Sequence, residues 1–250
     1  MRRPSEPITL EGKEGFMLPV DIDTPIHEIC PELAEFIARY PFVEEGLEEM
    51  KKFDEENPFK HSLRMGHAAR RVNDTMEIVP EKMKENFLIA VLLHDIGKTD
   101  LSQNVFLGEE EHGIEEKQYR ERHAREGFEW IRKYNETASE IAVAHHEFQD
   151  EPYPRKSLDR QPTPPPGGWT SEQQKTEHVK TKKEIMHLAR ILAILDSFDA
   201  MTNNRTYQQA KDVQEVGDIL RQKFNTEEDY MIIDMLVEET KKMAPSNTEK

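Results

Sequence analysis

Apolar residues recur at intervals of three and four positions through most of the chain beyond residue 30. The segments 31–40 and 42–53 show this spacing first. Thr24-Pro25, before them, is a typical helix start, because a capping side chain is followed by proline. Apolar residues at this spacing share one face of an α-helix. Residues 1–24 predict an extended arm with at most one short strand, and the rest of the sequence shows no succession of strands and no internal repeat, so the pattern predicts an all-α fold.

Two later segments are apolar on nearly all sides. They are "AVLLH" at residues 90–94 and "ARILAILDSF" at residues 189–198. Helices of this kind lie in the middle of a protein rather than at its surface. The first belongs to a predicted helix that starts after Pro80 and ends at Gly97, because glycine is common at helix ends. The remaining helices are predicted over residues 60–79, 115–134, 136–147, 180–202, 210–224 and 226–243.

Residues 151–174 interrupt the helical pattern with six prolines and two glycines. Proline lacks a backbone donor and clashes inside a helix, so this segment cannot be helical throughout. The segment is also longer than an ordinary connection. Two interpretations fit it. One is a disordered surface insertion, and the other is a flap beside a functional site, with Tyr153 and Trp169 as apolar contacts.

The charge and the apolar content exclude several classes of partner. The 50 acidic and 34 basic residues give a formal net charge of −16. Nucleic-acid polymers and acidic membrane surfaces bind basic proteins, so neither is an expected partner. The longest apolar runs, such as "FLIAVLL", are far shorter than the roughly 20 residues that span a bilayer. The N-terminus lacks the apolar core of a secretory signal, and the single Cys30 cannot form an internal disulfide, so a cytoplasmic protein is expected.

Several histidines and aspartates stand on or at the ends of the predicted helices. Asp95 and Asp196 follow strongly apolar segments, and a buried carboxylate is costly unless a cation pairs with it. No lysine or arginine stands near Asp196 on the same helix face, whereas a metal ion would pair with the aspartates and the histidines together. The candidate metal ligands are His61, His94, Asp95, His123, His145, His146 and Asp196.

These five histidines and two aspartates are too many for one metal ion, which takes about four to six ligands including water. They predict two divalent ions that share one carboxylate. His94 and Asp95 are neighbours and point about 100° apart on a helix, which suits a bridging Asp95 beside a terminal ligand. A set of histidines and carboxylates without thiolates suits iron, manganese or zinc, with nickel, cobalt and magnesium as alternatives. Two neighbouring ions can clamp a phosphate group, so the set predicts hydrolysis of a phosphate ester.

Five motifs occur in a fixed order: "HSLRM", "HDIGK", "HAREG", "HHE" and "DSFDAMTNNRTY". Together they resemble the HD-domain metal-dependent phosphohydrolases, and most closely the HD-GYP branch, the cyclic di-GMP phosphodiesterases. The resemblance covers roughly residues 55–240. It implies an HD-type helical bundle around a dinuclear site made by the seven residues named above, with Asp95 as the bridge.

The resemblance also implies roles for residues beside the metals. Asp95 and Lys98 take part in catalysis, and Lys98 and Arg205 bind substrate phosphates. Tyr207 either contacts the substrate or packs in the core. Asp199, one turn beyond Asp196, is expected to support the site through hydrogen bonds.

The sequence departs from the HD-GYP pattern at several positions. Pro152 replaces the glycine of the Gly-Tyr-Pro motif, although the Tyr-Pro that follows remains. Thr206 and Gln208 replace a proline and a basic residue in the last motif. Asn57 stands where members with three metals carry a glutamate, which favours two ions. These departures leave the identity of the phosphate ester open.

The predicted organisation has three parts. Residues 1–54 form an extended arm and accessory helices, residues 55–243 form the catalytic domain with a proline-rich insertion at about 151–180, and residues 244–250 form a flexible tail. The predicted function is hydrolysis of a cyclic dinucleotide or related signalling nucleotide by attack of a metal-bridged hydroxide. The alternatives are hydrolysis of another small phosphate ester such as a mononucleotide, nucleotide binding without hydrolysis, and di-iron oxygenase chemistry. The sequence predicts no oligomeric state.

Overall fold

The computed structural model describes residues 31–52, 58–100, 121–148, 152–153, 171–203 and 209–243. The predictions for the N-terminal arm, Thr24-Pro25, most of the proline-rich insertion, Arg205, Tyr207 and the C-terminal tail lie outside these residues. Within the described ranges the fold is all-α, as the apolar spacing predicts, and no strand occurs. None of the helices in these ranges is both long and apolar enough to cross a membrane.

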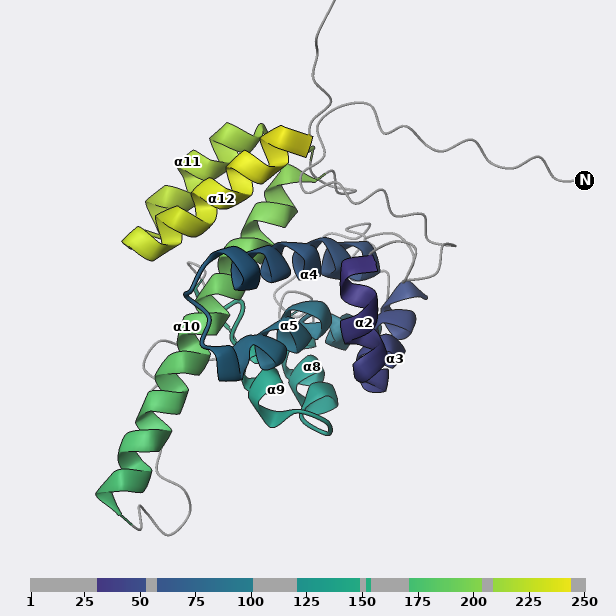
Figure 1. Ribbon diagram of the computed structural model, residues 1–250. Coiled ribbons are helices and arrows are strands. Elements are labelled where there is room, and N and C mark those ends of the chain that lie inside the picture. The colour runs from purple at the N-terminus through teal and green to yellow at the C-terminus, as the bar shows by residue number, and fades with distance from the viewer. Residues whose placement is uncertain are drawn as a thin grey trace, which may run out of the picture.

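The described helices fall into two groups along the chain (Figure 1). The first group comprises α2 (Pro31–Arg39), α3 (Pro41–Lys51), α4 (Pro58–Thr75) and α5 (Lys84–Leu93). Two 3₁₀ helices, η1 (Glu81–Met83) and η2 (Ile96–Asp100), flank α5. The second group comprises α8 (His123–Ile131), α9 (Glu136–Val143), α10 (Glu172–Thr202), α11 (Val213–Lys223) and α12 (Glu227–Met243).

The core is built around α5, which is buried along its whole apolar run from Phe87 to Leu93. Helices α3, α4 and α9 pack against α5, and α10 packs against α4 and α9. Full burial of one such leucine, isoleucine or phenylalanine stabilises the fold by about 1.5–3 kcal/mol. The C-terminal part of α10, from Leu188 to Phe198, contributes a second buried run. The predicted central position of both apolar segments is therefore confirmed.

Helices α11 and α12 lie side by side at the C-terminal end of α10 (Figure 1). Both contact α10 and each other. Asp212 caps the start of α11, because its side chain accepts hydrogen bonds from the backbone N–H groups of Gln214 and Glu215. Buried apolar residues of the pair, among them Val216, Leu220 and Ile232, join the same core. The pair is thus packed on α10 by an apolar face.

Two predicted helices end earlier than the sequence suggests. The helix predicted to reach Gly97 ends at Leu93, and the one predicted to reach residue 147 ends at Val143. At both ends a histidine ring donates a hydrogen bond to a backbone carbonyl oxygen of the last turn. Nδ1 of His94 donates to the oxygen of Val91 at 2.8 Å, and Nδ1 of His145 donates to the oxygen of Ala142 at 2.6 Å. Carbonyl oxygens at a helix end have no further backbone partner, so a side chain can satisfy them.

The role predicted for Gly97 as a helix stop is wrong. Gly97 lies inside η2 and does not have the left-handed backbone conformation of a glycine cap. A Cβ atom at this position would lie 2.0 Å from the carbonyl oxygen of His123 and 2.4 Å from the backbone nitrogen of Gly127. Glycine is required here because the backbone of η2 runs directly against the first turns of α8.

We expect Gly97→Ala to lower the free energy of unfolding by about 1–3 kcal/mol or more, because the new methyl group must push η2 and α8 apart. The matched control is Gly127→Ala on the other side of the same contact. Its Cβ would have 3.4 Å to its nearest neighbour, an ordinary contact, so its unfolding free energy should stay within about 1 kcal/mol of wild type. Urea titrations of both variants test this, and equal stability of the two would contradict it.

Candidate metal centre

The structure brings all seven candidate ligands into one cluster, although they come from five separate parts of the chain. His61 lies in α4, and Asp196 lies in α10. His94 and Asp95 follow the end of α5, and His123 opens α8. The remaining two, His145 and His146, follow the end of α9. The ends of α5, α8 and α9 therefore meet α4 and α10 at a single point.

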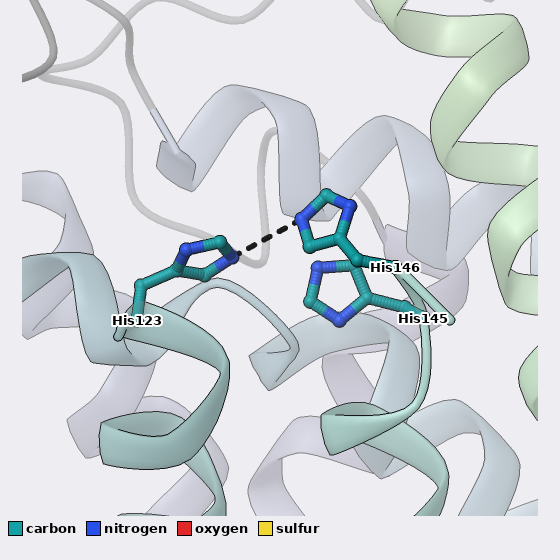
Figure 2. Close-up of side chains that lie close together, drawn as sticks. All are labelled: His123, His145 and His146. Atoms are coloured by element: carbon teal, nitrogen blue, oxygen red, sulfur yellow. Dashed lines mark hydrogen bonds between the residues drawn. The ribbon is translucent and has the colours of Figure 1, made fainter. Parts of the chain in front are cut away.

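The cluster consists of two groups with Asp95 between them. The ligand atoms of His61, His94 and Asp196 lie within 4.8 Å of one another, and so do those of the second group, His123, His145 and His146. Figure 2 shows the second group, with the ring of His123 facing His146 across a distance of 3.2 Å between the two Nε2 atoms.

Asp95 reaches both groups with its two carboxylate oxygens. Its Oδ2 lies 3.8 Å from Nε2 of His61, and its Oδ1 lies 3.5 Å from Nε2 of His123. Asp95 also forms a third potential ligand set with His94 and His145. A carboxylate in this position can share its two oxygens between two cations, which matches the bridging position expected for this residue.

The ring orientations fit metal binding. His61, His94 and His145 each use Nδ1 to donate a hydrogen bond away from the cluster, to Asp199, Val91 and Ala142. Each Nε2 is then left with its lone pair toward the cluster, the arrangement found when a second residue orients a metal-binding histidine. Nε2 of His145 is buried without a hydrogen-bond partner among the described residues.

The close contact between the Nε2 atoms of His61 and His94 also favours a cation at this position. Their Nε2 atoms lie only 3.1 Å apart. Two lone pairs that face each other repel, whereas a proton or a metal ion between them satisfies both. The donor set therefore fits divalent cations on the geometry of this chain alone.

The charge states also suit ligands. Burial would raise the pKa of Asp95, but the Lys98 ammonium and the surrounding imidazoles hold it well below its usual range. Burial likewise opposes ionisation of Asp196, and the hydrogen bond and charge of His61 hold its pKa well below the usual range. Burial and the neighbouring His94 lower the pKa of His145 to about 4. The aspartates are thus ionised and this imidazole is neutral near neutral pH, which are the forms that bind metals.

A second layer of polar contacts holds His61 in place. Asp199 Oδ2 accepts the hydrogen bond from His61 Nδ1 at 2.7 Å, which confirms the supporting role expected for Asp199. Arg64 donates two hydrogen bonds of 2.7 and 2.8 Å to the same carboxylate. Asn203 donates a further hydrogen bond to it at 3.1 Å. The sequence analysis missed Arg64. The available signal was its position three residues after His61, on the same side of α4.

A cavity of about 390 Å³ opens beside the cluster. Asp95, His146 and Asp196 form one side of it, together with Lys98, whose Nζ lies 2.6 Å from Asp95 Oδ2. The C-terminal end of α10 and the last turns of α11 form the rest of the wall, through Ser197, Ala200, Met201, Ile219, Leu220 and Lys223. The size is within the range of small-molecule sites.

A second cavity, of about 310 Å³, lies on the surface between α2, α4 and α5. Its cations are already paired: Arg39 and Lys84 contact the carboxylates of Glu85 and Glu81 at 3.1 and 2.7 Å. It has no member of the seven-residue cluster in its wall. The cavity beside the cluster is therefore the better candidate for a phosphorylated ligand.

Tyr153 belongs to the proline-rich insertion, and it lies at the cluster. Its ring stacks on that of His146 with 4.5 Å between the centroids, and it meets the ring of His123 at 6.2 Å. This position agrees with the predicted contact between the insertion and the site. Trp169, Arg205 and Tyr207 lie outside the described residues, so their predicted contacts stay predictions.

Comparison with known proteins finds a match to the family of HD domains over residues 59–201, a range that includes all seven residues of the cluster. A protein named cyclic di-GMP phosphodiesterase from Thermotoga maritima is 28% identical over 190 residues, which cover 72% of this chain and 45% of that protein. The chain thus matches less than half the length of this relative. Helices α11 and α12 lie beyond the part that matches the HD domain.

We expect metal affinity to weaken as the pH falls, because protons compete for His61. Burial favours the neutral ring, but hydrogen bonds and charges of Asp196 and Asp199 outweigh burial and raise the pKa of His61 in the metal-free protein. The charged ring stabilises the metal-free fold below that pKa, and this stabilisation is lost as the pH rises through it. Metal binding must displace the proton, so calorimetry in buffers of different ionisation enthalpy should detect proton release that fades above the pKa of His61.

Asp199→Asn should move this proton-release profile to lower pH and weaken metal affinity by about 10- to 100-fold, because His61 loses a charged partner. The matched control is Asp229→Asn, which alters another buried aspartate, paired with Arg190 outside the cluster. It should reduce stability without changing metal affinity or the pH profile. Identical metal binding in wild type and Asp199→Asn would contradict the role given to Asp199.

Proposed function

The chain belongs to the HD domain family, and on this premise we propose that it is a metal-dependent phosphodiesterase that hydrolyses a cyclic dinucleotide or a related signalling nucleotide. The observation that carries the proposal is the position of Asp95, with one carboxylate oxygen toward each of two groups of ligand atoms. The name of the relative from Thermotoga maritima supports the same class of substrate.

In this proposal the cluster holds two divalent ions. His61, His94 and Asp196 would hold one, and His123, His145 and His146 would hold the other, with Asp95 available to both. Iron or manganese fits this mixture of imidazoles and carboxylates best, with zinc, nickel, cobalt or magnesium as alternatives. When bound, such a pair lowers the pKa of coordinated water and neutralises charge on a phosphate group.

Lys98 supplies a positive charge next to the reacting group. Its ammonium is hydrogen-bonded to Asp95 and lines the cavity, so a phosphate seated on the cluster lies within its reach. Negative charge develops on the phosphate oxygens as the phosphodiester bond breaks, and a cation fixed at that point stabilises it. The carboxylate of Asp95 holds the ammonium in place before the substrate arrives.

Hydrolysis of another small phosphate ester, such as a mononucleotide, is the second candidate. The replacement of the family glycine by Pro152 favours it, because this change falls beside Tyr153, which stacks on the cluster. A panel of cyclic dinucleotides, mononucleotides and simple phosphodiesters, tested with the manganese-loaded protein, separates the two candidates by which substrate is cleaved fastest.

We further propose that the catalytic unit extends over residues 55–243 rather than ending with the matched range. Residues of α11 line the cavity, and α12 packs on both α10 and α11. A chain shortened after Thr202 would open one wall of the cavity.

Asp95→Ala should abolish both metal loading and phosphodiester hydrolysis, because it removes the carboxylate shared by both groups. The matched control is Asp100→Ala, an exposed aspartate at the end of η2. It should keep two metal ions per chain and the activity of wild type. Metal analysis by mass spectrometry and hydrolysis assays measure the two effects, and full activity in Asp95→Ala would show the site assignment to be wrong.

A further inference from the structure

The wall of the cavity that α11 provides lies outside the matched HD domain. Three residues near the end of α11 form it: Ile219, Leu220 and Lys223. They line the same cavity as Asp95 and Lys98. Part of the cavity wall therefore comes from a segment whose role the family match does not address.

Lys223 differs from Arg221 and Lys242, two other cations of the α11 and α12 pair, and from Lys241, whose Nζ donates to the side-chain oxygen of Gln214 at 2.8 Å. Arg221 donates to Asp218 and Asp234, and Lys242 contacts Glu239. Among the described residues, no carboxylate pairs with Lys223, and its Nζ instead lies 5.9 Å from the ring centroid of Phe224. The chain has a net charge of −16, so a lysine without a carboxylate partner in the wall of a cavity is an available site for an anion.

The end of α11 is held firmly on α10. The guanidinium of Arg190 lies over the rings of Phe224 and Phe148, at 5.3 and 5.7 Å. Arg190 also donates two hydrogen bonds to Asp229, of 2.9 and 2.7 Å. Asp229 in turn accepts a hydrogen bond from the backbone of Thr226 at the start of α12. This network fixes the backbone of Lys223 relative to the cluster.

A lysine in the last turn of a helix is also favoured by the helix dipole, to which an exposed cation contributes about 0.3–1 kcal/mol. That preference accounts for a cation at this end of α11. It does not account for a lysine that lines the cavity while Arg221, in the same turn, pairs with carboxylates.

We propose that Lys223 binds a second phosphate of the substrate, while the phosphate to be cleaved sits at the metal cluster beside Lys98. The apolar residues Met201, Ile219 and Leu220, which line the same cavity, then cover the base or sugar that joins the phosphates. This inference rests on the proposed function and deepens it. It makes Lys223 a residue that favours substrates with two phosphates over those with one.

Equilibrium binding to the manganese-loaded full chain tests the proposal without depending on turnover. The probes are the linear dinucleotide 5′-phosphoguanylyl-guanosine, which carries two phosphates, and guanosine 5′-monophosphate, which carries one. Lys223→Ala should weaken binding of the dinucleotide about tenfold, the loss expected for one charged hydrogen bond at a partly exposed site. Binding of the monophosphate should change by less than about twofold. Lys223→Arg should restore most of the dinucleotide affinity, which a purely structural role of Lys223 would not produce.

The charge-matched control is Lys242→Ala, which removes an exposed lysine of α12 that does not line the cavity. It should leave binding of both probes unchanged. The proposal is wrong if Lys223→Ala weakens binding of both probes equally or of neither. It is also wrong if Lys242→Ala weakens dinucleotide binding as much as Lys223→Ala does, or if the wild type does not bind the dinucleotide.

Hydrolysis assays separate this inference from the proposed function. On cyclic di-GMP, Lys223→Ala should raise KM about tenfold with little change in kcat, and on bis(p-nitrophenyl) phosphate, with its single phosphate, it should change neither. If the wild type cleaves no phosphodiester but binds the dinucleotide through Lys223, the proposed function fails and the second phosphate site stands. If the wild type cleaves phosphodiesters and Lys223→Ala changes the affinity for both probes equally, the proposed function stands and the second phosphate site fails.

Discussion

Burial of negative charge at Asp95 is the constraint on which the rest of the site depends. This carboxylate is only 2% exposed, and Asp196 and Asp199 lie nearby. Buried carboxylates destabilise a fold unless cations or hydrogen bonds compensate them. Lys98 provides one cation at Asp95, and Arg64 provides another at Asp199. In the metal-free protein a protonated His61 supplies further positive charge, and divalent ions bound to the neutral imidazoles would supply the same compensation.

The ends of the helices give the cluster its geometry. His94 and His145 each stand just past the end of an apolar helix and cap it with Nδ1. The same hydrogen bond that satisfies the helix end turns Nε2 toward the cluster. A single hydrogen bond thus both satisfies the helix end and orients the metal-binding nitrogen. The apolar helices α5 and α9 fix the position of these histidines by packing in the core. The contact at Gly97 brings α8, and with it His123, against η2. Only a residue without a side chain allows this close approach.

Two partly buried pairs of arginine and aspartate connect α10 to α4 and to α12. Arg64 of α4 binds Asp199, one turn beyond Asp196, and Arg190 binds Asp229 at the start of α12. Paired guanidinium and carboxylate groups fix orientation as well as distance. The first pair positions a histidine of the cluster. The second also places Arg190 over the ring of Phe224 at the end of α11, next to Lys223, which lines the cavity.

The sequence alone determined the all-α class, the two buried helices and the seven residues of the cluster. The first two depend on apolar spacing, and the seven residues depend on ionisable residues at the ends of predicted helices and on five motifs in a fixed order. The sequence did not determine where the helices end. By sequence, His94 and His145 are compatible with a continuing helix, and only the structure shows that their rings donate hydrogen bonds to the carbonyl oxygens of Val91 and Ala142. Gly97 was misinterpreted for the same reason, since its close neighbour His123 is distant in the sequence.

Only the tertiary structure decided which residues surround the cluster. Arg64 and Lys223 are ordinary surface residues by sequence, and their partners lie on helices far along the chain. Their positions follow from how α4 and α11 cross α10, which the pattern of a single helix does not encode. Contacts between distant segments depend on packing, so the sequence identified the donors and the fold decided which charges face them.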